Sequence, residues 1–247
     1  MRRAICLLLV LLSLAPSLRA GDEKYQLTLL LSPTAEWLRF SKSINSGTYN
    51  NSFGTKLSYN FGVEYKRFFD PSLSFSVGAI YMNKGFRNQI RNQDGSRAGS
   101  TLASIHIAAV PLSLNLHHRL RRKVEMIYTA GITGGYVFSE RARNNYLSGE
   151  TDPVQGIWDL SEGGVEMNLF RDYYVGAHFG IGISTYVKSR IVLIVQPMYR
   201  YQLHDARDFS GQFNSNDPFV ARLNSFGIDL KIGYFFTKQI RNRKKQY

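Results

Sequence analysis

The sequence of 247 residues contains a single cysteine, Cys6, which lies in an apolar segment near its start. Two arginines precede this segment, Ala4–Leu14, and small residues follow it up to Ala20. The pattern is typical of a secretory signal peptide, and we predict cleavage after Ala20. Cleavage removes the cysteine, which excludes a disulfide scaffold, a cysteine-ligated zinc site and a thiol enzyme for the mature chain.

Long apolar runs are also missing from the rest of the chain. After Gly21 no run reaches the roughly 18 apolar residues that a membrane helix requires, and helical periodicity is scarce. Acidic residues are few, since 18 Asp and Glu stand against 31 Lys and Arg. Loss of three arginines with the signal peptide lowers the net charge from +13 to +10. The mature chain is therefore either soluble outside the cytoplasm or crosses a membrane as β-strands.

What the sequence does contain is alternation with a period of two residues. Between Lys56 and Lys66 the odd positions are aliphatic or aromatic, whereas the even positions are polar or glycine. Such alternation predicts a strand with one apolar and one polar face. Comparable segments give eight predicted strands, near residues 25–31, 56–66, 73–82, 104–116, 124–138, 173–183, 193–201 and 226–236.

The connections between these strands alternate in length. Short turns follow the second, fourth and sixth strands, and long polar connections follow the first, third, fifth and seventh. This alternation is typical of a membrane barrel whose two ends face different compartments. The long connections are predicted at about 41–55, 85–101, 140–170 and 204–222, and the third holds an aromatic and charged set suited to protein or glycan contact.

Two features favour a membrane barrel with a polar lumen. Aromatic residues gather at the strand ends, and the strand faces opposite the apolar ones carry Gly, Ser and isolated charges. We therefore predict an all-β fold, an eight-stranded antiparallel up-and-down transmembrane β-barrel. The predicted segments are a signal peptide over 1–20, the barrel over 21–236 and a basic tail over 237–247. Both termini are expected in the periplasm. The alternative is a soluble periplasmic calyx that binds an apolar ligand.

Several strand motifs resemble those of the PorT-like outer-membrane barrel family. They are Ala108–Leu114, with its proline, before a basic turn; the glycine-rich Tyr128–Tyr136; Tyr174–Gly182; and the aromatic-ended Ser225–Phe236. The resemblance covers essentially the whole mature chain. It implies an eight-stranded outer-membrane barrel without established enzymatic activity, whose family namesake is associated with type IX secretion. The tail after Phe236 departs from the family pattern.

Two groups of polar residues are candidate functional sites. One is a polar network that we predict to face the lumen and to be either internally ion-paired or part of a conducting path. The other is a basic periplasmic patch that would contact anionic lipid, peptidoglycan or a protein, or be solvated. The lumen group is Glu64, Glu125, His178, Arg200, Asp229 and Lys231. The basic patch is Arg119, Arg121, Arg122, Lys123, Lys238, Arg241, Arg243, Lys244 and Lys245.

Other motifs provide little support for catalysis. Ser104 and His106 share a strand face, but no acid is placed to orient the histidine as a base. His117 and His118 are adjacent, so on a strand they would point to opposite faces, and we interpret them as turn histidines at a membrane edge. The prediction is a non-enzymatic protein without cofactor or metal, supporting envelope structure, interaction or secretion. Its partners would be outer-membrane lipid and periplasmic or secretion proteins, and not nucleic acid; a lipid-modifying barrel enzyme is a third alternative.

Overall fold

The computed structural model describes residues 24–40, 45–46, 49–92, 94–121, 123–146, 171–206 and 221–236. The predicted signal peptide and the basic tail lie outside these residues. Within them, no helix is both long and apolar enough to cross a membrane. The strands are β1 (Lys24–Phe40), β2 (Asn45–Ser46), β3 (Tyr49–Gly54), β4 (Lys56–Phe68), β5 (Leu73–Asn92), β6 (Arg97–Arg121), β7 (Val124–Tyr146), β8 (Tyr173–Tyr186), β9 (Ile191–Gln202) and β10 (Ala221–Phe235).

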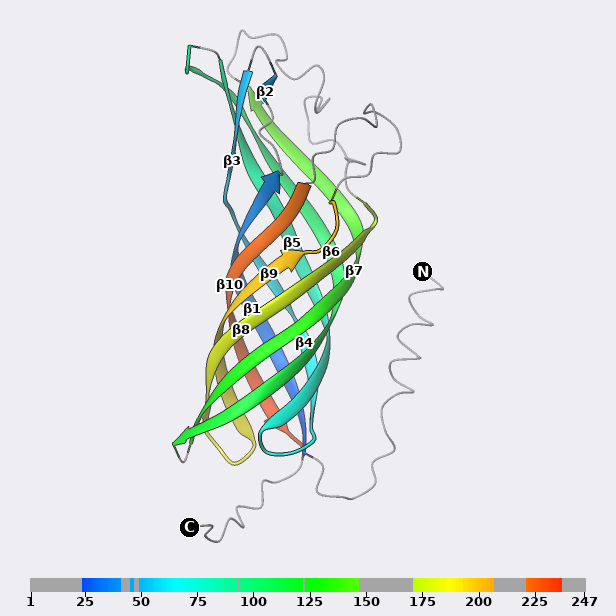
Figure 1. Ribbon diagram of the computed structural model, residues 1–247, viewed down its shortest axis with the longest axis vertical. Coiled ribbons are helices and arrows are strands. Elements are labelled where there is room, and N and C mark those ends of the chain that lie inside the picture. The colour runs from blue at the N-terminus through cyan, green and yellow to red at the C-terminus, as the bar shows by residue number, and fades with distance from the viewer. Residues whose placement is uncertain are drawn as a thin grey trace.

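Eight of the strands form a closed antiparallel ring, which confirms the predicted fold (Figure 1). β1 pairs with both β4 and β10, and pairing of β5 with β6 completes the circle. The short β2 and β3 lie outside the ring, where β3 extends the sheet alongside β5. Both ends of the described chain, Lys24 and Phe236, lie at one end of the barrel with the three short turns (Figure 1). We call this the terminal end.

The register of the paired strands defines how steeply they are inclined to the barrel axis. Following paired residues once around the ring from Glu36 on β1 returns to β1 at Gln26, ten residues away. A stagger of ten residues over eight strands corresponds to a tilt of about 40°. The paired residues are Glu36, Ser225, Arg200, His178, Gly131, Ser113, Ser76, Lys66 and Gln26.

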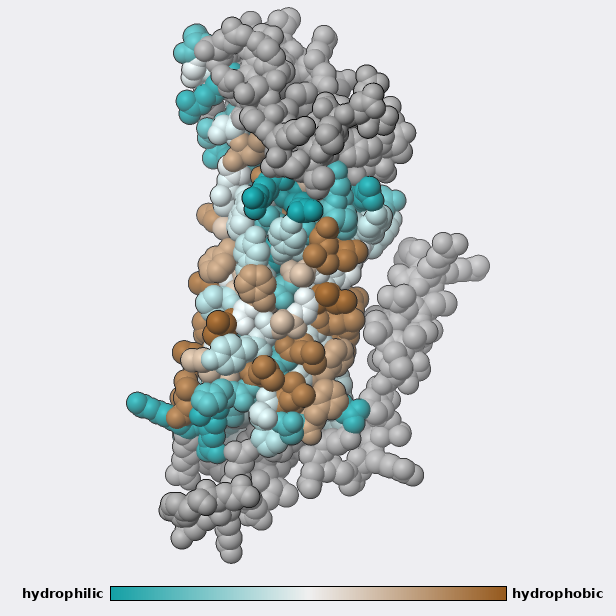
Figure 2. All heavy atoms as spheres, viewed as in Figure 1, coloured by the Kyte–Doolittle hydropathy of each residue, from teal (hydrophilic) through white to brown (hydrophobic). Residues whose placement is uncertain are grey.

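The side chains on this row point inward and are polar apart from one glycine, whereas the outward positions are apolar. On β8, for example, Val175, Phe179 and Ile181 are exposed while His178 is buried. The outward residues of β8 run from Tyr173 to Ile183, and ten residues at this tilt span about 26 Å, close to the apolar band of outer-membrane barrels. Figure 2 shows the resulting apolar belt between two polar ends. A soluble calyx has the opposite arrangement, so that alternative does not fit.

Three of the predicted long loops are wrong in part. The segment 41–55 contains β2 and β3. The segment 85–101 is a long hairpin, because β5 continues to Asn92 and β6 begins at Arg97. Likewise β7 continues to Tyr146, so the beginning of the predicted loop 140–170 is strand, and residues 147–170 lie outside the described ones. Residues 83–92, 97–106 and 138–146 together project beyond the rim, and we call them the arm (Figure 1).

The interior is less polar than predicted. At the arm end it holds an apolar cluster from β5, β6, β8 and β10 that includes Phe86, Ile105 and Tyr174. At the terminal end a second cluster packs Phe68 and Tyr186 against Phe235, with ring centroids 5.7 and 5.9 Å apart. The buried charges around Asp229 therefore lie between two apolar layers.

Candidate functional site

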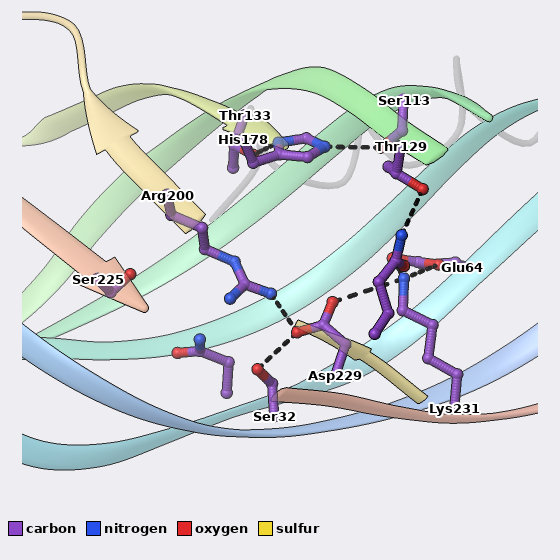
Figure 3. Close-up of polar contacts among 12 residues, drawn as sticks. Ser32, Glu64, Ser113, Thr129, Thr133, His178, Arg200, Ser225, Asp229 and Lys231 are labelled. Carbon is purple, nitrogen blue, oxygen red and sulfur yellow. Dashed lines mark hydrogen bonds and ion pairs between the residues drawn. The ribbon is translucent and has the colours of Figure 1, made fainter. Parts of the chain in front are cut away.

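Four of the predicted lumen residues form one ion-paired network between the two apolar layers (Figure 3). Arg200 Nη2 donates to Asp229 Oδ1 at 2.6 Å, and Lys231 Nζ lies 3.5 Å from Asp229 Oδ2. Lys231 also donates to both oxygens of Glu64, at 3.1 and 3.0 Å. The network joins β4, β9 and β10, as the predicted internal ion pairing requires.

Burial makes this pairing a structural necessity. All four side chains are less than a tenth exposed. An isolated ion in such surroundings costs several kcal/mol, whereas a paired and hydrogen-bonded ion recovers most of that energy. Ser32 on β1 adds a hydrogen bond from its hydroxyl to Asp229 Oδ1 at 2.6 Å. Asp229 therefore connects two cations and a neighbouring strand.

An uncharged relay of hydrogen bonds crosses the lumen next to this network. Gln196 Nε2 donates to Thr129 Oγ1 at 2.8 Å, Thr129 donates to Asn115 at 2.7 Å, and Asn115 donates to Ser76 at 3.2 Å. The relay passes over β8 at Gly182, where a Cβ would lie 2.6 Å from that of Gln196. The absence of a side chain there allows β9 to reach β7 across the barrel.

His178 is buried as predicted but is held by hydroxyl groups rather than by ions. Its Nε2 lies 2.8 Å from Ser113 Oγ and its Nδ1 lies 2.9 Å from Thr133 Oγ1 (Figure 3). Both ring nitrogens have a partner that either donates or accepts, so a neutral ring satisfies the site. The opposing position on β7 is Gly131, where a Cβ would lie 2.7 Å from the His178 ring.

A second buried ion pair was not predicted from the sequence. Lys84 Nζ donates to Glu36 Oε2 at 3.2 Å and to Ser225 Oγ at 3.1 Å, and both charged side chains are fully buried. The ammonium also lies 5.3 Å from the ring centroid of Tyr174. The sequence signal was the inward parity of Glu36, which continues that of Ser32 beyond the predicted end of the strand.

Glu125 does not join the central network. It lies near the terminal end, where Tyr186 donates to both of its oxygens at 3.3 Å and His117 Nδ1 lies 3.7 Å away. The interpretation of His117 as a turn residue is wrong, because β6 continues past it and its ring contacts Ser74 Oγ at 2.8 Å inside the barrel. Its neighbour His118 is exposed, as opposite faces require.

The described part of the basic patch lies at the β6–β7 turn of the terminal end. Arg119, Arg121 and Lys123 are exposed there, and Arg119 Nε donates to the Arg121 carbonyl at 3.4 Å. The remaining members lie outside the described residues: Arg122, Lys238, Arg241, Arg243, Lys244 and Lys245.

Ser104 and His106 are not hydrogen-bonded to each other. Ser104 Oγ accepts from Lys56 Nζ at 2.8 Å, and His106 Nδ1 lies 2.5 Å from the Tyr81 hydroxyl. A serine nucleophile requires the base within hydrogen-bond reach, and that contact is missing between these two residues. Among the described residues there is also no group of three His, Cys, Asp or Glu side chains that would hold a metal ion.

Taken together, the lumen contains a charged layer closed on both sides by apolar clusters. The charged groups hold one another, so their arrangement stabilises the barrel interior.

Comparisons with known proteins assign no family, since no family model and no curated protein matches the chain. Solved barrels of similar outline include Neisserial surface protein A, at 12% identity and a TM-score of 0.44, covering 86% of this chain and 99% of that one. OprG from Pseudomonas aeruginosa has 8% identity and a TM-score of 0.45, covering 87% and 95%. The outer membrane protein AlkL has 14% identity and a TM-score of 0.43, covering 93% and 98%.

Proposed function

We propose that this protein is an outer-membrane β-barrel without enzymatic activity that acts by display, scaffolding or support of envelope assembly. The observation that carries the proposal is the filled lumen. Glu64, Lys231, Asp229 and Arg200 occupy its middle, with apolar clusters on either side. A barrel without an open interior exerts its function through its surfaces.

The proposed orientation places the terminal end in the periplasm and the arm outside the cell. An even number of strands puts both chain ends at one end of the barrel, and the short turns lie at that same end. Short periplasmic turns and longer outer connections are the rule for such barrels. The predicted signal peptide over 1–20 supports export.

A more specific role in type IX secretion or a related envelope process is the form of the proposal that the PorT-like resemblance suggests. The arm and the basic patch are the two surfaces available for a protein partner. In-cell crosslinking followed by co-purification from outer membranes tests this role. Recovery of secretion components supports it, whereas recovery of lipid and assembly factors alone contradicts it.

Electrical recording tests the filled lumen directly. We expect no stable single-channel conductance from the purified, folded chain in a planar bilayer, because ion pairs and apolar clusters block the path. An open porin in the same bilayer is the control. Stable, voltage-independent steps from this protein would contradict the filled lumen and with it the proposal.

A further inference from the structure

The outer wall has an aromatic patch where β4, β5 and β7 approach the arm. Tyr59, Phe61 and Tyr81 cluster there, with the Phe61 and Tyr81 rings 4.9 Å apart, and the Phe138 ring lies 6.2 Å from Tyr81. Tyr59, Phe61 and Phe138 are about half exposed. Aromatic rings on the outside of a barrel mark the membrane interface. The patch therefore marks where the apolar belt ends on this side.

Directly beyond the patch, an ammonium group fills a break in the wall. Backbone pairing of β4 with β5 stops at Asn60 and Met82, and pairing of β3 with β5 begins only at Gly54 and Arg87. Side chains bridge the intervening gap. Lys56 Nζ is the main bridge and donates to Asn83 Oδ1 at 2.9 Å, to the Lys84 carbonyl at 3.1 Å and to Ser104 Oγ at 2.8 Å.

The contacts of Lys56 use all three of its N–H groups on neutral oxygens, so the residue contributes positive charge to the outer side but no further hydrogen bond. Glu36 interacts with Lys56 electrostatically from the lumen side, but this carboxylate is hydrogen-bonded to Lys84. Gly85 leaves room for the ammonium, because a Cβ at that position would lie 3.0 Å from Lys56 Nζ.

Two exposed arginines continue the positive charge onto the arm. Arg141 lies three residues beyond Phe138, and Arg87 lies six beyond Tyr81, about 8 and 15 Å further along the barrel axis at the strand tilt. Arg91 is four residues beyond Arg87, too far along the axis to contact lipid at the patch. Within the described residues no carboxylate forms an ion pair with Arg87 or Arg141. We call Lys56, Arg87 and Arg141 the cationic shelf, in which Lys56 contributes charge and the two arginines contribute the N–H groups.

We propose that the cationic shelf binds the phosphate groups of outer-leaflet lipids whose acyl chains lie against the aromatic patch. The inference rests on the proposed membrane orientation. Guanidinium groups bind phosphate oxygens in a bidentate manner, and each basic residue near a membrane surface contributes about 1 kcal/mol to binding of anionic lipid. His106 is close enough to Lys56 and Arg141 to interact electrostatically with both, which brings these two cations near the patch.

The test measures binding of fluorescent phosphatidic acid to the purified full-length protein in detergent micelles. We compare the double variant Arg87→Gln and Arg141→Gln with a matched double variant at the terminal end, Arg67→Gln and Lys188→Gln. Loss of two shelf charges is expected to weaken binding at least tenfold, as the contributions of the two residues together predict. The matched variant is expected to bind within twofold of the unaltered chain.

Two further probes identify the source of the phosphate. Phosphatidylcholine with the same acyl chains is expected to bind at least tenfold more weakly, and soluble glycerol phosphate is expected not to displace the bound lipid. Equal affinity of both double variants, or displacement by glycerol phosphate, overturns the proposal. An acidic peptide or nucleic acid that displaces the lipid at lower concentration also overturns it.

A folding check separates failure of the shelf from failure of the proposed function. A folded barrel migrates as a compact species on gels until it is heated. If the unaltered chain does not insert into lipid vesicles, the proposed membrane function fails. If it inserts and binding is insensitive to the shelf charges, only the present inference fails. Should the double variant not fold, Arg141→Gln alone is expected to weaken binding about fivefold, and unchanged binding overturns the proposal.

Discussion

At the scale of single residues, Asp229 determines whether the buried charges are balanced. Its removal leaves Arg200 buried without its carboxylate partner, while Lys231 retains Glu64. We expect Asp229→Ala to lower the free energy of unfolding by roughly 3–5 kcal/mol, the usual effect of removing one partner of a buried pair. Urea-induced unfolding in phospholipid vesicles, followed by tryptophan fluorescence, measures the change.

Two comparisons make this prediction specific. Asp172→Ala removes an exposed carboxylate and is expected to change stability by less than about 0.5 kcal/mol. Replacing the pair together, by Arg200→Met with Asp229→Leu, is expected to destabilise less than Asp229→Ala alone, because no uncompensated charge remains. A larger loss in the double variant would contradict the assigned pairing.

Asp70 is a hydrogen-bonded carboxylate outside the membrane, in the turn between β4 and β5. Its carboxylate accepts from the Ser72 hydroxyl and amide, both at 2.6 Å, and from the Leu73 amide at 2.9 Å. These hydrogen bonds, those of Ser72 above all, hold the pKa of Asp70 below its ordinary value of 3.8. A lowered pKa in the folded state means that the stabilisation is present above the ordinary value and is lost as the pH falls through the lowered one.

The expected result is a pH dependence that belongs to this turn. Thermal unfolding of the unaltered chain, scanned from about pH 5 to about pH 2, should include a loss of stability that Asp70→Asn lacks. Ser72→Ala should remove part of the same dependence, because it deletes the largest cause of the shift. An identical pH profile for all three chains would show that the turn does not respond to protonation.

At the scale of strands, β7 shows how glycine positions make room for the interior. Gly131 faces His178, and an added Cβ would lie 2.7 Å from the imidazole and would also contact the Leu112 carbonyl. Contacts this short force the ring or the backbone to move. We therefore expect Gly131→Ala to destabilise the barrel by about 1–3 kcal/mol, measured as a lower urea midpoint of the compact species.

Gly134 on the same strand is the matched control. No atom lies within 4 Å of the Cβ that an alanine would place there, and the position is exposed. Gly134→Ala is expected to change stability by less than about 0.5 kcal/mol. Equal effects of the two substitutions would mean that close packing against His178 is not what Gly131 provides.

The ring of strands could be predicted because each face keeps one parity over many residues. Exposed or half-buried positions alternate with buried ones along β8 from Tyr173 to Thr185 and along β10 from Ser225 to Phe235. The short turns at the terminal end could be predicted for the same reason, because each joins two strands with clear alternation. Alternation is a local property, and the sequence therefore carries it directly.

Other parts of the structure depend on contacts that alternation does not encode. The first strand was predicted only near residues 25–31. Pro33 sits at an outward position where β1 and β10 skip two paired residues, so β1 continues and brings Glu36 inside. The arm-end interior was expected to be polar, whereas Ile105 and Ile107 fill it. A bulge between His106 and Ile107 also shifts the parity of β7, which strict alternation does not anticipate.

At the scale of the whole molecule, the apolar belt sets the position of the barrel relative to lipid. Leu230 lies midway along the outward face of β10. Arg at a lipid-facing position near the bilayer centre costs about 2–4 kcal/mol, and at the interface about 0–1 kcal/mol. We expect Leu230→Arg to lower the free energy of unfolding in vesicles by about 2–4 kcal/mol, measured by urea titration.

Leu120, next to the β6–β7 turn, provides the comparison for depth. It is about as exposed as Leu230, at 48% against 43%. Leu120→Arg is expected to cost less than about 1 kcal/mol because its position lies at the membrane edge. If the two substitutions had equal effects, the belt would not be facing lipid.

The buried ion pairs join parts of the chain that are synthesised far apart in time. Asp229 and Lys231 lie on the last strand, whereas their partners Ser32 and Glu64 lie on the first two strands of the ring. A chain interrupted before β10 therefore holds Glu64 without Lys231 and Arg200 without Asp229. Completion of the final strand both closes the barrel wall and supplies the partners of these buried charges. The interior is therefore ion-paired in a finished polypeptide and not in a truncated one.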